Sequence, residues 1–343
     1  MKRKVLIAAG GTGGHLLPAQ QLAQLVEEQG SEVLFAGYKL DRSPYFSRDR
    51  FRFREIASAP LKKRKTTLAR KLLQGFFQAL WLLLRERPHV IVGFGSYHVA
   101  PVLFAAALLR KKIILYEPNR ILGKVNRLLV PFAQKIAVQF PLDSHPKFVP
   151  ISLFPWIRAQ PLEKEAACRE LGLDPKRRVL LIFGGSQGAS FLNETMPEVV
   201  RQLGEVQVIH LAGSDEAANS VRELYAKANV SAVVKGFESK MHVAYSAADF
   251  AVCRSGAGTI GELLYFQLPA LLIPYPYAAD DHQQHNAEFL TSLGGCVTLA
   301  QPQATPPALV ETIQTADWAG MKLALRRFEE QNRNRIAFEE LLT

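Results

Sequence analysis

The stretch VLIAAGGTGGH, from Val5 to His15, predicts the fold class of this chain. It starts as an uninterrupted apolar run with the length and β-branched content of a buried strand. Four glycines follow within five residues, and glycine allows positive φ and a close approach of the backbone to a ligand. Pro18 and the apolar spacing after it suit the first turn of a helix. A strand, a glycine turn and a helix N-terminus together point backbone N–H groups at an anion.

A second copy of this pattern, VLLIFGGSQGA, runs from Val179 to Ala189. Both copies read as an apolar strand, Gly-Gly, a hydroxyl residue, a short spacer and another glycine. One such turn alone is commonly a tight turn without a ligand. Here the copies begin at Gly10 and Gly184, about half of the 343-residue chain apart. The sequence therefore predicts two similar α/β domains, each opened by an anion-binding turn.

Apolar runs separated by helical patterns extend through both halves. Because they do not alternate with polar residues, they indicate parallel sheets covered on both faces. We expect strands at residues 4–9, 32–36, 89–93, 112–115 and 135–138, and then at 178–183, 206–210, 231–234, 249–252, 270–273 and 296–298.

The segment 140–161 contains five prolines and reads as the connector between the halves. We expect a first domain at residues 1–155 and a second at residues 156–317. The strongly helical segment 318–343 is expected to pack back on the first domain.

Composition places the chain among globular proteins, because 48% of its residues are hydrophobic and 21% are charged. The three cysteines are scattered and lack the spacing of metal ligands, which fits a reducing cytosol. The chain enters a strand at once, so no signal peptide is expected. The longest nearly apolar stretch, residues 72–84, is too short to span a bilayer.

Charge divides unevenly between the halves. Residues 1–157 hold 25 Lys and Arg against 9 Asp and Glu, whereas residues 158–343 hold 17 against 22. The first half is therefore expected to meet an anionic partner, such as nucleic acid, phospholipid or a phosphorylated substrate. Nucleic acid is not expected, because the sequence holds no stacking module or recognition-helix motif.

Two common nucleotide-binding motifs are not matched by the glycine turns. A dinucleotide fingerprint would need glycine where Leu16 stands, and no acidic residue ends the second predicted strand. A phosphate-binding loop of the Walker A type would need Gly-Lys-Ser/Thr, which follows neither glycine turn.

In the block CRSGAGTIGELLYFQLPALLIPYP, Cys253 to Pro276, a predicted strand ends at the turn Arg-Ser-Gly, and a helix is predicted to start near Ala257. Glu262 lies in that helix, and a carboxylate there can accept both hydroxyls of a ribose. A solvated helix glutamate is the alternative interpretation. In the following block AADDHQQHNAEFL, Gln283 and Gln284 are candidates for sugar hydroxyls, or simply part of a capped helix start.

Taken together, these motifs resemble the MurG family of bacterial glycosyltransferases. The motifs come in family order over residues 5–290: GGTGGH at 10–15, GFGSY at 93–97, EPN at 117–119, GGSQGA at 184–189, RSGAGTIGE at 254–262 and DHQQHNA at 281–287. The resemblance implies a GT-B fold, in which two Rossmann-like domains with parallel sheets face each other across a cleft.

The implied activity is that of a hexosyltransferase in peptidoglycan synthesis. It is the inverting transfer of N-acetylglucosamine from UDP-N-acetylglucosamine to the 4-hydroxyl of N-acetylmuramic acid in lipid I, giving lipid II. No metal or cofactor is expected, and no Asp-x-Asp motif occurs in the sequence. Two alternatives remain open: a GT-B enzyme for a soluble small-molecule acceptor, and a nucleotide-sugar-binding protein without catalysis.

The resemblance also implies roles for single residues. Thr12, Gly13 and Gly14 match the turn at the donor sugar and the acceptor, and Asn119 matches an asparagine that contacts N-acetylglucosamine. The residues implied for the donor diphosphate, the uracil and ribose, and the donor sugar are, in that order, Ser186, the segment Ala257–Glu262 including Thr259, and Gln283.

The sequence departs from the family at three places. The usual His-Glu-Gln-Asn is Tyr-Glu-Pro-Asn at 116–119, so the loop that holds Asn119 is expected to differ in shape. The usual Gly-Gly-Tyr is Gly-Ser-Tyr at 95–97. The hinge Asn-Pro-x-Arg has no clean counterpart. Spacing puts Ser152 at the arginine position and Arg158 is a displaced candidate, so this arginine stays unassigned.

His15 is the candidate catalytic base for the acceptor hydroxyl. A positioned base contributes about 10²–10⁴-fold in rate. A helix N-terminus disfavours the imidazolium form and would keep His15 neutral. The alternative is a structural role, in which the ring bonds to a neighbouring backbone group.

The segment from Leu61 to Pro88 predicts how the protein meets the membrane. The apolar stretch 72–84 is expected to be mostly buried against the first sheet, whereas the basic run before it must face solvent or a partner. A lipid-linked acceptor stays in the inner leaflet, so we expect a cytoplasmic protein, peripheral on the inner face of the membrane and bound to anionic phospholipid. The basic side chains are Lys62, Lys63, Arg64, Lys65, Arg70 and Lys71.

Overall fold

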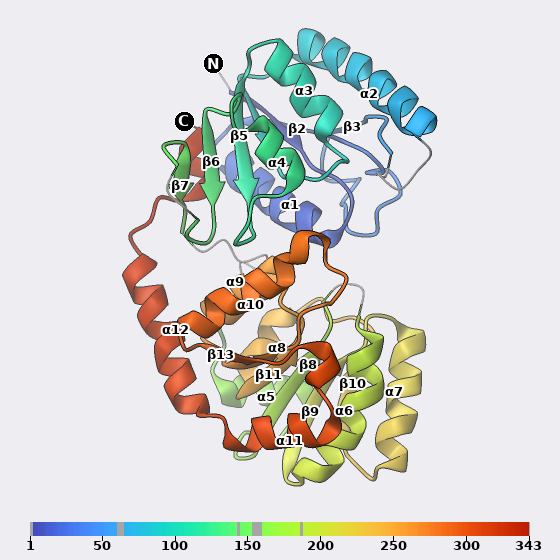
Figure 1. Cartoon of the computed structure of the whole chain (residues 1–343), viewed down its shortest axis with the longest axis vertical. Helices are drawn as coiled ribbons and strands as arrows, with labels where there is room; N and C mark the ends of the chain where they lie inside the picture. The colour runs from blue at the N-terminus through green and yellow to red at the C-terminus, as the bar shows by residue number, and fades with distance from the viewer. Residues whose placement is uncertain (1–2, 60–64, 143–144, 153–159, 186–187, 343) are drawn as a thin grey trace. The chain divides into compact units, whose positions relative to one another are not determined.

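The computed structural model describes residues 3–59, 65–142, 145–152, 160–185 and 188–342 (Figure 1). The chain forms two compact units, one of residues 1–156 with 334–343 and the other of residues 157–333. Each unit is an α/β domain around its own parallel sheet, as the duplicated glycine turns predict.

The N-terminal unit is built on a seven-stranded sheet in the order β3-β2-β1-β4-β5-β6-β7, and every neighbouring pair is parallel. Its strands are β1 Lys4–Ala8, β2 Glu32–Gly37, β3 Phe53–Glu55, β4 Val90–Gly93, β5 Lys112–Glu117, β6 Lys135–Val138 and β7 Phe148–Pro150. Its helices are α1 Gly13–Glu28, α2 Lys65–Glu86, α3 Ala100–Leu108, α4 Lys124–Leu129 and the 3₁₀ helix η3 Phe338–Leu342.

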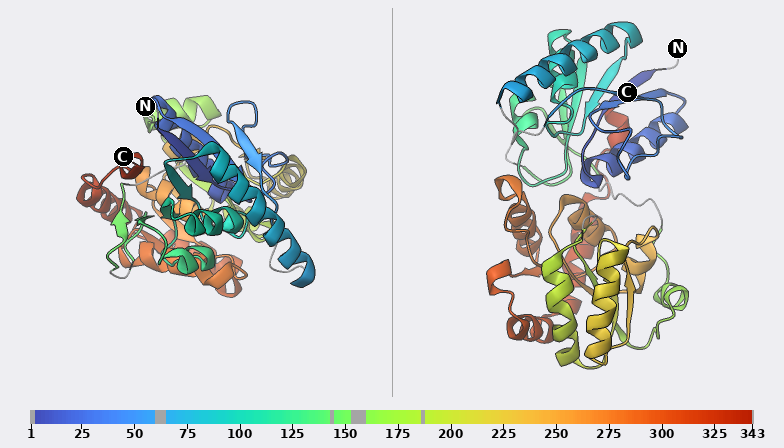
Figure 2. Two further views of the ribbon diagram at one scale, coloured as in Figure 1. Left: turned by 90° about the horizontal axis from the view of Figure 1, so that it is seen from above. Right: turned by 90° about the vertical axis from the view of Figure 1, so that its right-hand side faces the viewer.

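Helices cover both faces of this sheet because successive strand residues point to opposite sides. Val5 and Ile7 of β1 pack with α1 and η3, whereas Leu6 and Ala8 pack with α2, α3 and α4. The two layers are visible on either side of the sheet in Figure 2. The strand order reverses between β1 and β4, so this is the topological switch point at which parallel α/β sheets bind ligands.

The C-terminal unit has a six-stranded parallel sheet in the order β10-β9-β8-β11-β12-β13. Its strands are β8 Arg178–Phe183, β9 Val206–Leu211, β10 Ala232–Lys235, β11 Phe250–Cys253, β12 Ala270–Leu272 and β13 Cys296–Thr298. Its α-helices are α5 Lys164–Leu171, α6 Ser190–Leu203, α7 Asp215–Lys227, α8 Met241–Ala247, α9 Ala257–Tyr265, α10 His282–Ser292, α11 Pro306–Thr315 and α12 Trp318–Asn332. Two 3₁₀ helices complete it, η1 Ala279–Asp281 and η2 Gln301–Gln303.

The faces of the second sheet are divided in the same way. Leu180 and Ile182 of β8 pack with α6, α7 and α11. Phe183 points to the opposite side, where its ring meets Tyr245 of α8 edge-on at 5.7 Å. The switch point of this sheet lies between β8 and β11.

Three expectations about the elements need correction. Helix α1 begins at Gly13, and Pro18 lies inside it rather than in its first turn. Strands β3 and β7 are additional to those expected. Strand β7 belongs to the proline-rich connector, and it pairs with β6. Because it is only three residues long and ends in Pro150, it has no strand signal in the sequence.

The C-terminal segment is divided differently from the expectation. Helix α12 packs in the C-terminal unit, where Trp318 stacks on Phe250 at 4.6 Å and Phe328 meets Phe289 at 5.6 Å. Only residues 334–343 join the N-terminal unit, where Ile336 bridges Ile151. They also place Phe338, Leu341 and Leu342 in the core beside α1.

Helix α2 is less buried than expected. Ala79, Leu82 and Leu83 face the core beneath it. Its opposite face is also apolar and exposed, with fractional exposures between 57% and 63%, at Leu73, Phe77, Trp81 and Leu84. The prediction of a mostly buried stretch at residues 72–84 was therefore wrong for one face of the helix.

Candidate active site

In the N-terminal unit, the predicted residues lie on loops that follow the adjacent strands β1, β4 and β5. The glycine turn follows β1, the segment 94–99 follows β4, and the loop holding Asn119 follows β5. The carboxyl ends of parallel strands lie at one edge of a sheet, so the topology gathers these loops at the switch point.

The first glycine turn leads directly into helix α1. Thr12 is the N-cap residue, and Gly13 and Gly14 form the first turn, where backbone N–H groups have no intrahelical carbonyl to bind. The half-buried ring of His15 lies beside the cap, with Nδ1 3.4 Å from Thr12 Oγ1. The structure thus brings all four predicted residues of this motif together at one helix N-terminus.

His98, which was not predicted from the sequence, packs against this turn at Gly11. His98, on the β4–α3 loop, is 9% exposed and stacks on Tyr97 at 3.9 Å and on Tyr38 at 5.8 Å. Its Nδ1 lies 2.7 Å from Ser96 Oγ. Burial lowers the pKa of His98 to about 4, and the nearby charges of His15 and Lys39 add to this effect. His98 is therefore a neutral ring at ordinary pH.

Asn119 is held by a buried carboxylate. Glu117 Oε1 accepts hydrogen bonds from the backbone N–H of Asn119 (3.1 Å) and from its Nδ2 (3.0 Å). The other oxygen, Oε2, accepts from the N–H of Gly123 (2.8 Å) and from Nδ2 of Asn126 (3.0 Å). Burial raises the pKa of Glu117, and these donors oppose the increase. Glu117 thus shapes the loop in which Pro118 replaces the family's usual glutamine.

In the C-terminal unit, the second glycine turn follows β8 and leads into α6. Gly185 and Gly188 have φ of +88° and +70°. A β-carbon on Gly188 would stand 2.3 Å from the carbonyl oxygen of Ala212, so only glycine fits there. Ser186, the predicted diphosphate ligand, lies outside the described residues.

The neighbouring turn after β11 presents the start of helix α9. Gly256 is its N-cap residue, Ala257 is half-buried, and Thr259 is buried. Glu262 lies one turn further along and is only 6% exposed. Its Oε2 accepts a hydrogen bond of 2.6 Å from the hydroxyl of Tyr245. The interpretation as a solvated helix glutamate was therefore wrong.

Burial dominates the electrostatics of Glu262. It raises the pKa of the carboxyl to about 7, although the hydrogen bond from Tyr245 acts in the opposite direction. A buried carboxyl with this pKa changes charge near neutral pH, and such groups cluster at functional sites.

Gln283 lies at the start of α10, where it is tied to two other loops. Its Oε1 accepts from the backbone N–H of Tyr275 (2.9 Å), and its carbonyl oxygen accepts from Ser255 Oγ (2.7 Å). The structure thus links the turns after β11 and β12 to the predicted sugar-binding segment. Gln284 instead donates to Glu288 of its own helix (3.0 Å).

Arg254, in the turn after β11, connects this turn to the turn after β12 and to η2. Its Nη1 donates to the carbonyl oxygens of Ile273 (3.0 Å) and Pro274 (3.2 Å), and its Nη2 donates to Gln301 (2.6 Å). Its guanidinium also lies 5.9 Å from the centroid of the Phe191 ring. Arg254 therefore holds the loop ends together beside the predicted donor residues.

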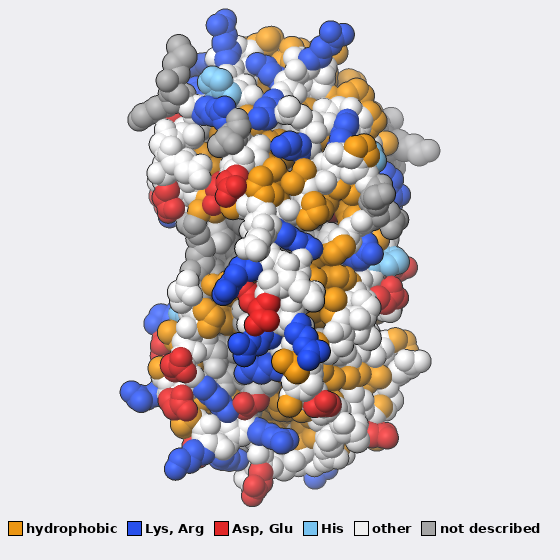
Figure 3. Space-filling model, turned by 90° about the vertical axis from the view of Figure 1, so that its left-hand side faces the viewer, with side chains coloured by type: hydrophobic (Ala, Val, Ile, Leu, Met, Phe, Trp, Pro, Cys, Tyr) orange, Lys and Arg blue, Asp and Glu red, His pale blue; other side chains and the backbone are white. Residues whose placement is uncertain are grey.

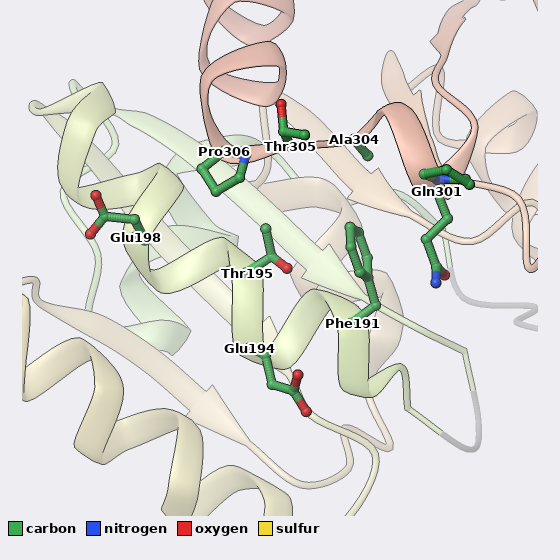
Figure 4. Close-up of a pocket in the computed structure, with 9 residues that line it drawn as sticks. Phe191, Glu194, Thr195, Glu198, Gln301, Ala304, Thr305 and Pro306 are labelled. Carbon is green, nitrogen blue, oxygen red and sulfur yellow. The ribbon is translucent and has the colours of Figure 1, made fainter.

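A groove of about 400 Å³ lies between α6 and the segment 301–306, next to Arg254 (Figure 4). None of the predicted site residues lines it. Its walls are Phe191, Glu194, Thr195, Glu198, Gln301, Pro302, Ala304, Thr305 and Pro306.

Two residues at which the sequence departs from the family pattern, Ser96 and Ser152, lie within the described residues. Ser96 adopts φ of +72°, a left-handed conformation that favours the glycine usual at this position. The backbone N–H of Ser152, at the hinge position, donates to the carbonyl oxygen of Ile336 (2.9 Å). Arg158 lies outside the described residues.

Within the described ranges, no group of three or more His, Cys, Asp or Glu side chains is arranged to hold a metal ion. None of the helices in these ranges combines the length and apolar content needed to cross a membrane.

Models of two known domains match the chain. The glycosyltransferase family 28 N-terminal domain matches residues 5–138, and the family 28 C-terminal domain matches residues 179–339. A curated protein of Protochlamydia amoebophila, UDP-N-acetylglucosamine--N-acetylmuramyl-(pentapeptide) pyrophosphoryl-undecaprenol N-acetylglucosamine transferase, is 37% identical over 328 residues. The match covers 92% of this chain and 87% of that protein. The chain belongs to the MurG family.

Further MurG comparisons agree. The transferase of the same name from Thiobacillus denitrificans is 34% identical over 341 residues, covering 92% of this chain and 90% of that protein. The crystal structure of Acinetobacter baumannii MurG has a TM-score of 0.78 and 26% identity, covering 100% of this chain and 98% of that one. These matches confirm the predicted GT-B fold class and a glycosyltransferase of the MurG family. They do not favour the alternatives of a soluble acceptor or a protein without catalysis.

Proposed function

We propose that this chain transfers N-acetylglucosamine from UDP-N-acetylglucosamine to the 4-hydroxyl of N-acetylmuramic acid in lipid I, giving lipid II. The observation that carries this proposal is the identity with transferases of that name along nearly the whole chain. The residues gathered at the switch points of the two sheets fit the two substrates of such a transfer.

The donor nucleotide is assigned to the C-terminal unit. The buried Glu262 carboxylate offers acceptors for the two ribose hydroxyls, because a carboxylate has about four lone-pair sites. Ala257 and Thr259 present the start of helix α9 to the uracil and ribose. Gln283 is assigned to the donor sugar and Ser186 to the diphosphate.

The acceptor and the donor sugar are assigned to the loops of the N-terminal unit. Thr12, Gly13 and Gly14 present the positive end of helix α1, and Asn119 presents a side chain fixed by Glu117. No metal or cofactor takes part in this assignment.

His15 is assigned as the base. As the 4-hydroxyl oxygen attacks C1 of N-acetylglucosamine, a C–O bond forms and the bond from C1 to the diphosphate oxygen breaks. The electron pair leaves with UDP, and the hydroxyl proton passes to the imidazole. In the tautomer in which Nδ1 donates to Thr12 Oγ1, the lone pair that takes this proton is on Nε2.

The membrane is assigned to the N-terminal unit. Helix α2 exposes an apolar face, and basic side chains accompany it at Arg70, Lys71 and Arg85. On the face of this unit that Figure 3 shows, in the upper half of the picture, Lys and Arg side chains also outnumber Asp and Glu. Apolar side chains combined with basic charge give reversible binding to an anionic lipid surface. We therefore propose a cytoplasmic enzyme, peripheral on the inner face of the membrane, which contacts anionic phospholipid and no nucleic acid.

A single-turnover assay with radiolabelled UDP-N-acetylglucosamine and a lipid I analogue tests the reaction. The expected result is label in the lipid-linked product with stoichiometric release of UDP. Transfer only to an acceptor without lipid would instead identify an enzyme for soluble acceptors, and tight donor binding without turnover would identify a binding protein.

A further inference from the structure

The Glu262 carboxylate is oriented by one neighbouring hydroxyl. Tyr245 comes from helix α8 and Glu262 from helix α9, so the contact joins two elements that flank β11 in sequence. The distance from the Tyr245 hydroxyl to Glu262 Oε2 is 2.6 Å, within the range of a strong hydrogen bond to an ionised acceptor. Among the described residues, this is the one hydrogen bond that the side chain of Glu262 receives.

The donor itself is rigid. The Tyr245 ring is 2% exposed and is stacked on Phe266 at 5.0 Å with an interplanar angle of 18°. Phe183 meets the same ring edge-on at 5.7 Å. Phe183 is the last residue of β8, directly before the second glycine turn. The hydroxyl is therefore fixed relative to both loops of the proposed nucleotide site.

A fixed donor at one lone pair of Oε2 determines the plane of the whole carboxyl group. Three of its roughly four acceptor sites remain, and both oxygens keep at least one. A cis-diol needs one acceptor for each hydroxyl. The arrangement therefore suits a ribose better than a carboxyl that rotates freely would.

We propose that Tyr245 is a positioning residue for the donor nucleotide, whose hydroxyl holds the Glu262 carboxylate in the orientation that accepts the ribose hydroxyls. This inference rests on the proposed function, because it takes UDP-N-acetylglucosamine as the donor. Tyr245 does not itself contact the nucleotide in this assignment, so its effect must depend on the presence of the diol.

Titration calorimetry with two nucleotides tests this dependence. UDP carries the diol, whereas 2′,3′-dideoxy-UDP has the same base and diphosphate and lacks both hydroxyls. Tyr245→Phe keeps the ring and its packing and removes only the hydroxyl. We expect it to weaken UDP binding about tenfold, the effect of losing one well-oriented hydrogen bond to a charged group, and to leave 2′,3′-dideoxy-UDP binding unchanged.

Tyr225→Phe is the matched control. Tyr225 is also a buried tyrosine of the C-terminal unit, and its hydroxyl bonds to His210 at 3.0 Å rather than to Glu262. This variant should bind both nucleotides as the wild type does. In kinetics, Tyr245→Phe should raise the donor KM while kcat stays within a few-fold, because the bond acts on binding.

A double-mutant cycle keeps the inference testable if Tyr245→Phe is poorly folded. With Glu262→Gln present, adding Tyr245→Phe should cause little further loss of UDP affinity, because the two changes disrupt one interaction. Equal losses for both nucleotides in Tyr245→Phe would overturn the inference and assign Tyr245 to packing. A wild type that binds UDP and 2′,3′-dideoxy-UDP equally would overturn it through the Glu262 assignment, and a wild type that binds neither would overturn the proposed function as well.

Discussion

The imidazole of His98 lies directly against Gly11 in the first glycine turn. A β-carbon on Gly11 would stand 2.6 Å from the ring carbon Cε1 of His98, and Gly11 has φ of +94°. Both the space and the backbone conformation therefore require glycine. The side chain of His98, from the neighbouring β4–α3 loop, therefore packs against the turn that leads into His15.

Gly11→Ala should consequently lower both stability and transfer. The positive φ alone costs about 1–2 kcal/mol for a residue with a β-carbon, and displacement of the His98 ring adds to this cost. Gly30→Ala is the control, because Gly30 has φ of +82° but no atom within 4 Å of its added β-carbon. Thermal melting and transfer assays compare the two variants, and equal effects would contradict the role of His98.

His15→Ala should lower kcat by about 10²-fold or more and leave donor affinity nearly intact, if His15 removes the proton of the acceptor hydroxyl. Steady-state kinetics with a lipid I analogue measure kcat, and calorimetry measures UDP binding. A kcat within a few-fold of the wild type would return His15 to a structural role at the helix N-terminus.

UDP affinity should rise between about pH 6 and pH 8. The pKa of Glu262 is raised to about 7, so the neutral acid prevails below this range and the ionised carboxylate, the better acceptor for the diol, prevails above it. Tyr245 and Cys253 face the same carboxyl, and burial raises both of their pKa values, so neither changes charge in this range.

Calorimetry at several pH values provides the measurement. The titration of the diphosphate is common to UDP and 2′,3′-dideoxy-UDP, so the difference between the two nucleotides isolates Glu262. Glu262→Gln should abolish the pH dependence of that difference. A pH-independent difference in the wild type would show that Glu262 does not face the ribose.

The apolar face of α2 should mediate binding to vesicles that contain phosphatidylglycerol or cardiolipin. Replacing Phe77 and Trp81 together with serine removes two exposed aromatic side chains without touching the core beneath. The variant should sediment less with vesicles, and salt should weaken the wild type, because each Lys or Arg near the surface contributes about 1 kcal/mol.

One control and a second test variant accompany the vesicle experiment. Leu323→Ser changes an exposed apolar residue of the C-terminal unit and should sediment normally. The second test variant, in which glutamate replaces Lys62, Lys63, Arg64 and Lys65, should weaken binding through charge alone. Lys62, Lys63 and Arg64 lie outside the described residues. Transfer to a water-soluble acceptor should survive all these changes, and unaltered sedimentation of the α2 and glutamate variants would reject this surface.

The stability of the C-terminal unit should fall in mild acid because of His210. Asn193 Oδ1 accepts from its Nε2 (3.0 Å), since the Asn193 amide already donates to the carbonyl oxygen of Ala212, so Nδ1 accepts from Tyr225 (3.0 Å). Burial lowers the pKa of this neutral ring to about 3. An unfolded histidine titrates near 6.5, so acid below that pH protonates the unfolded state first.

The free energy of unfolding should therefore fall by up to about 1.4 kcal/mol per pH unit between about pH 6 and pH 3. Urea denaturation at pH 7 and pH 5 measures this change, and His210→Gln should reduce it. His98 contributes in the same direction in the other unit, with a pKa lowered to about 4, so a His98→Gln variant is measured alongside. Identical pH dependence in His210→Gln and the wild type would contradict the assignment.

The sequence predicts the sheets well because parallel strands are buried on both faces and leave continuous apolar runs. It misses β3 and β7, which are three-residue edge strands with partly exposed side chains. Periodicity also fails for α2, because an apolar residue that faces solvent looks the same in sequence as one that faces the core.

The candidate site is predictable only where a motif carries it. The glycine turns and the position of Glu262 on a helix follow from local sequence. The burial of Glu262 depends on Tyr245, which is 17 positions away, and no local pattern connects them. His98 is a single histidine in a loop, so its place under Gly11 exists only after β1 and β4 pair.

The bridge between Ile151 and Ile336 gives the N-terminal unit an unusual order of assembly during translation. Its core needs Phe338, which stacks on Tyr116 at 5.1 Å, although the whole C-terminal unit is synthesised between them. At 5–20 residues per second, the ribosome takes roughly 10–35 s to translate residues 157–333, which form the C-terminal unit. For that time the nascent unit exposes the apolar surface that Phe338, Leu341 and Leu342 later cover. Chaperones thus have a defined period in which to bind it, and the C-terminal unit can finish folding before the unit whose sequence it interrupts.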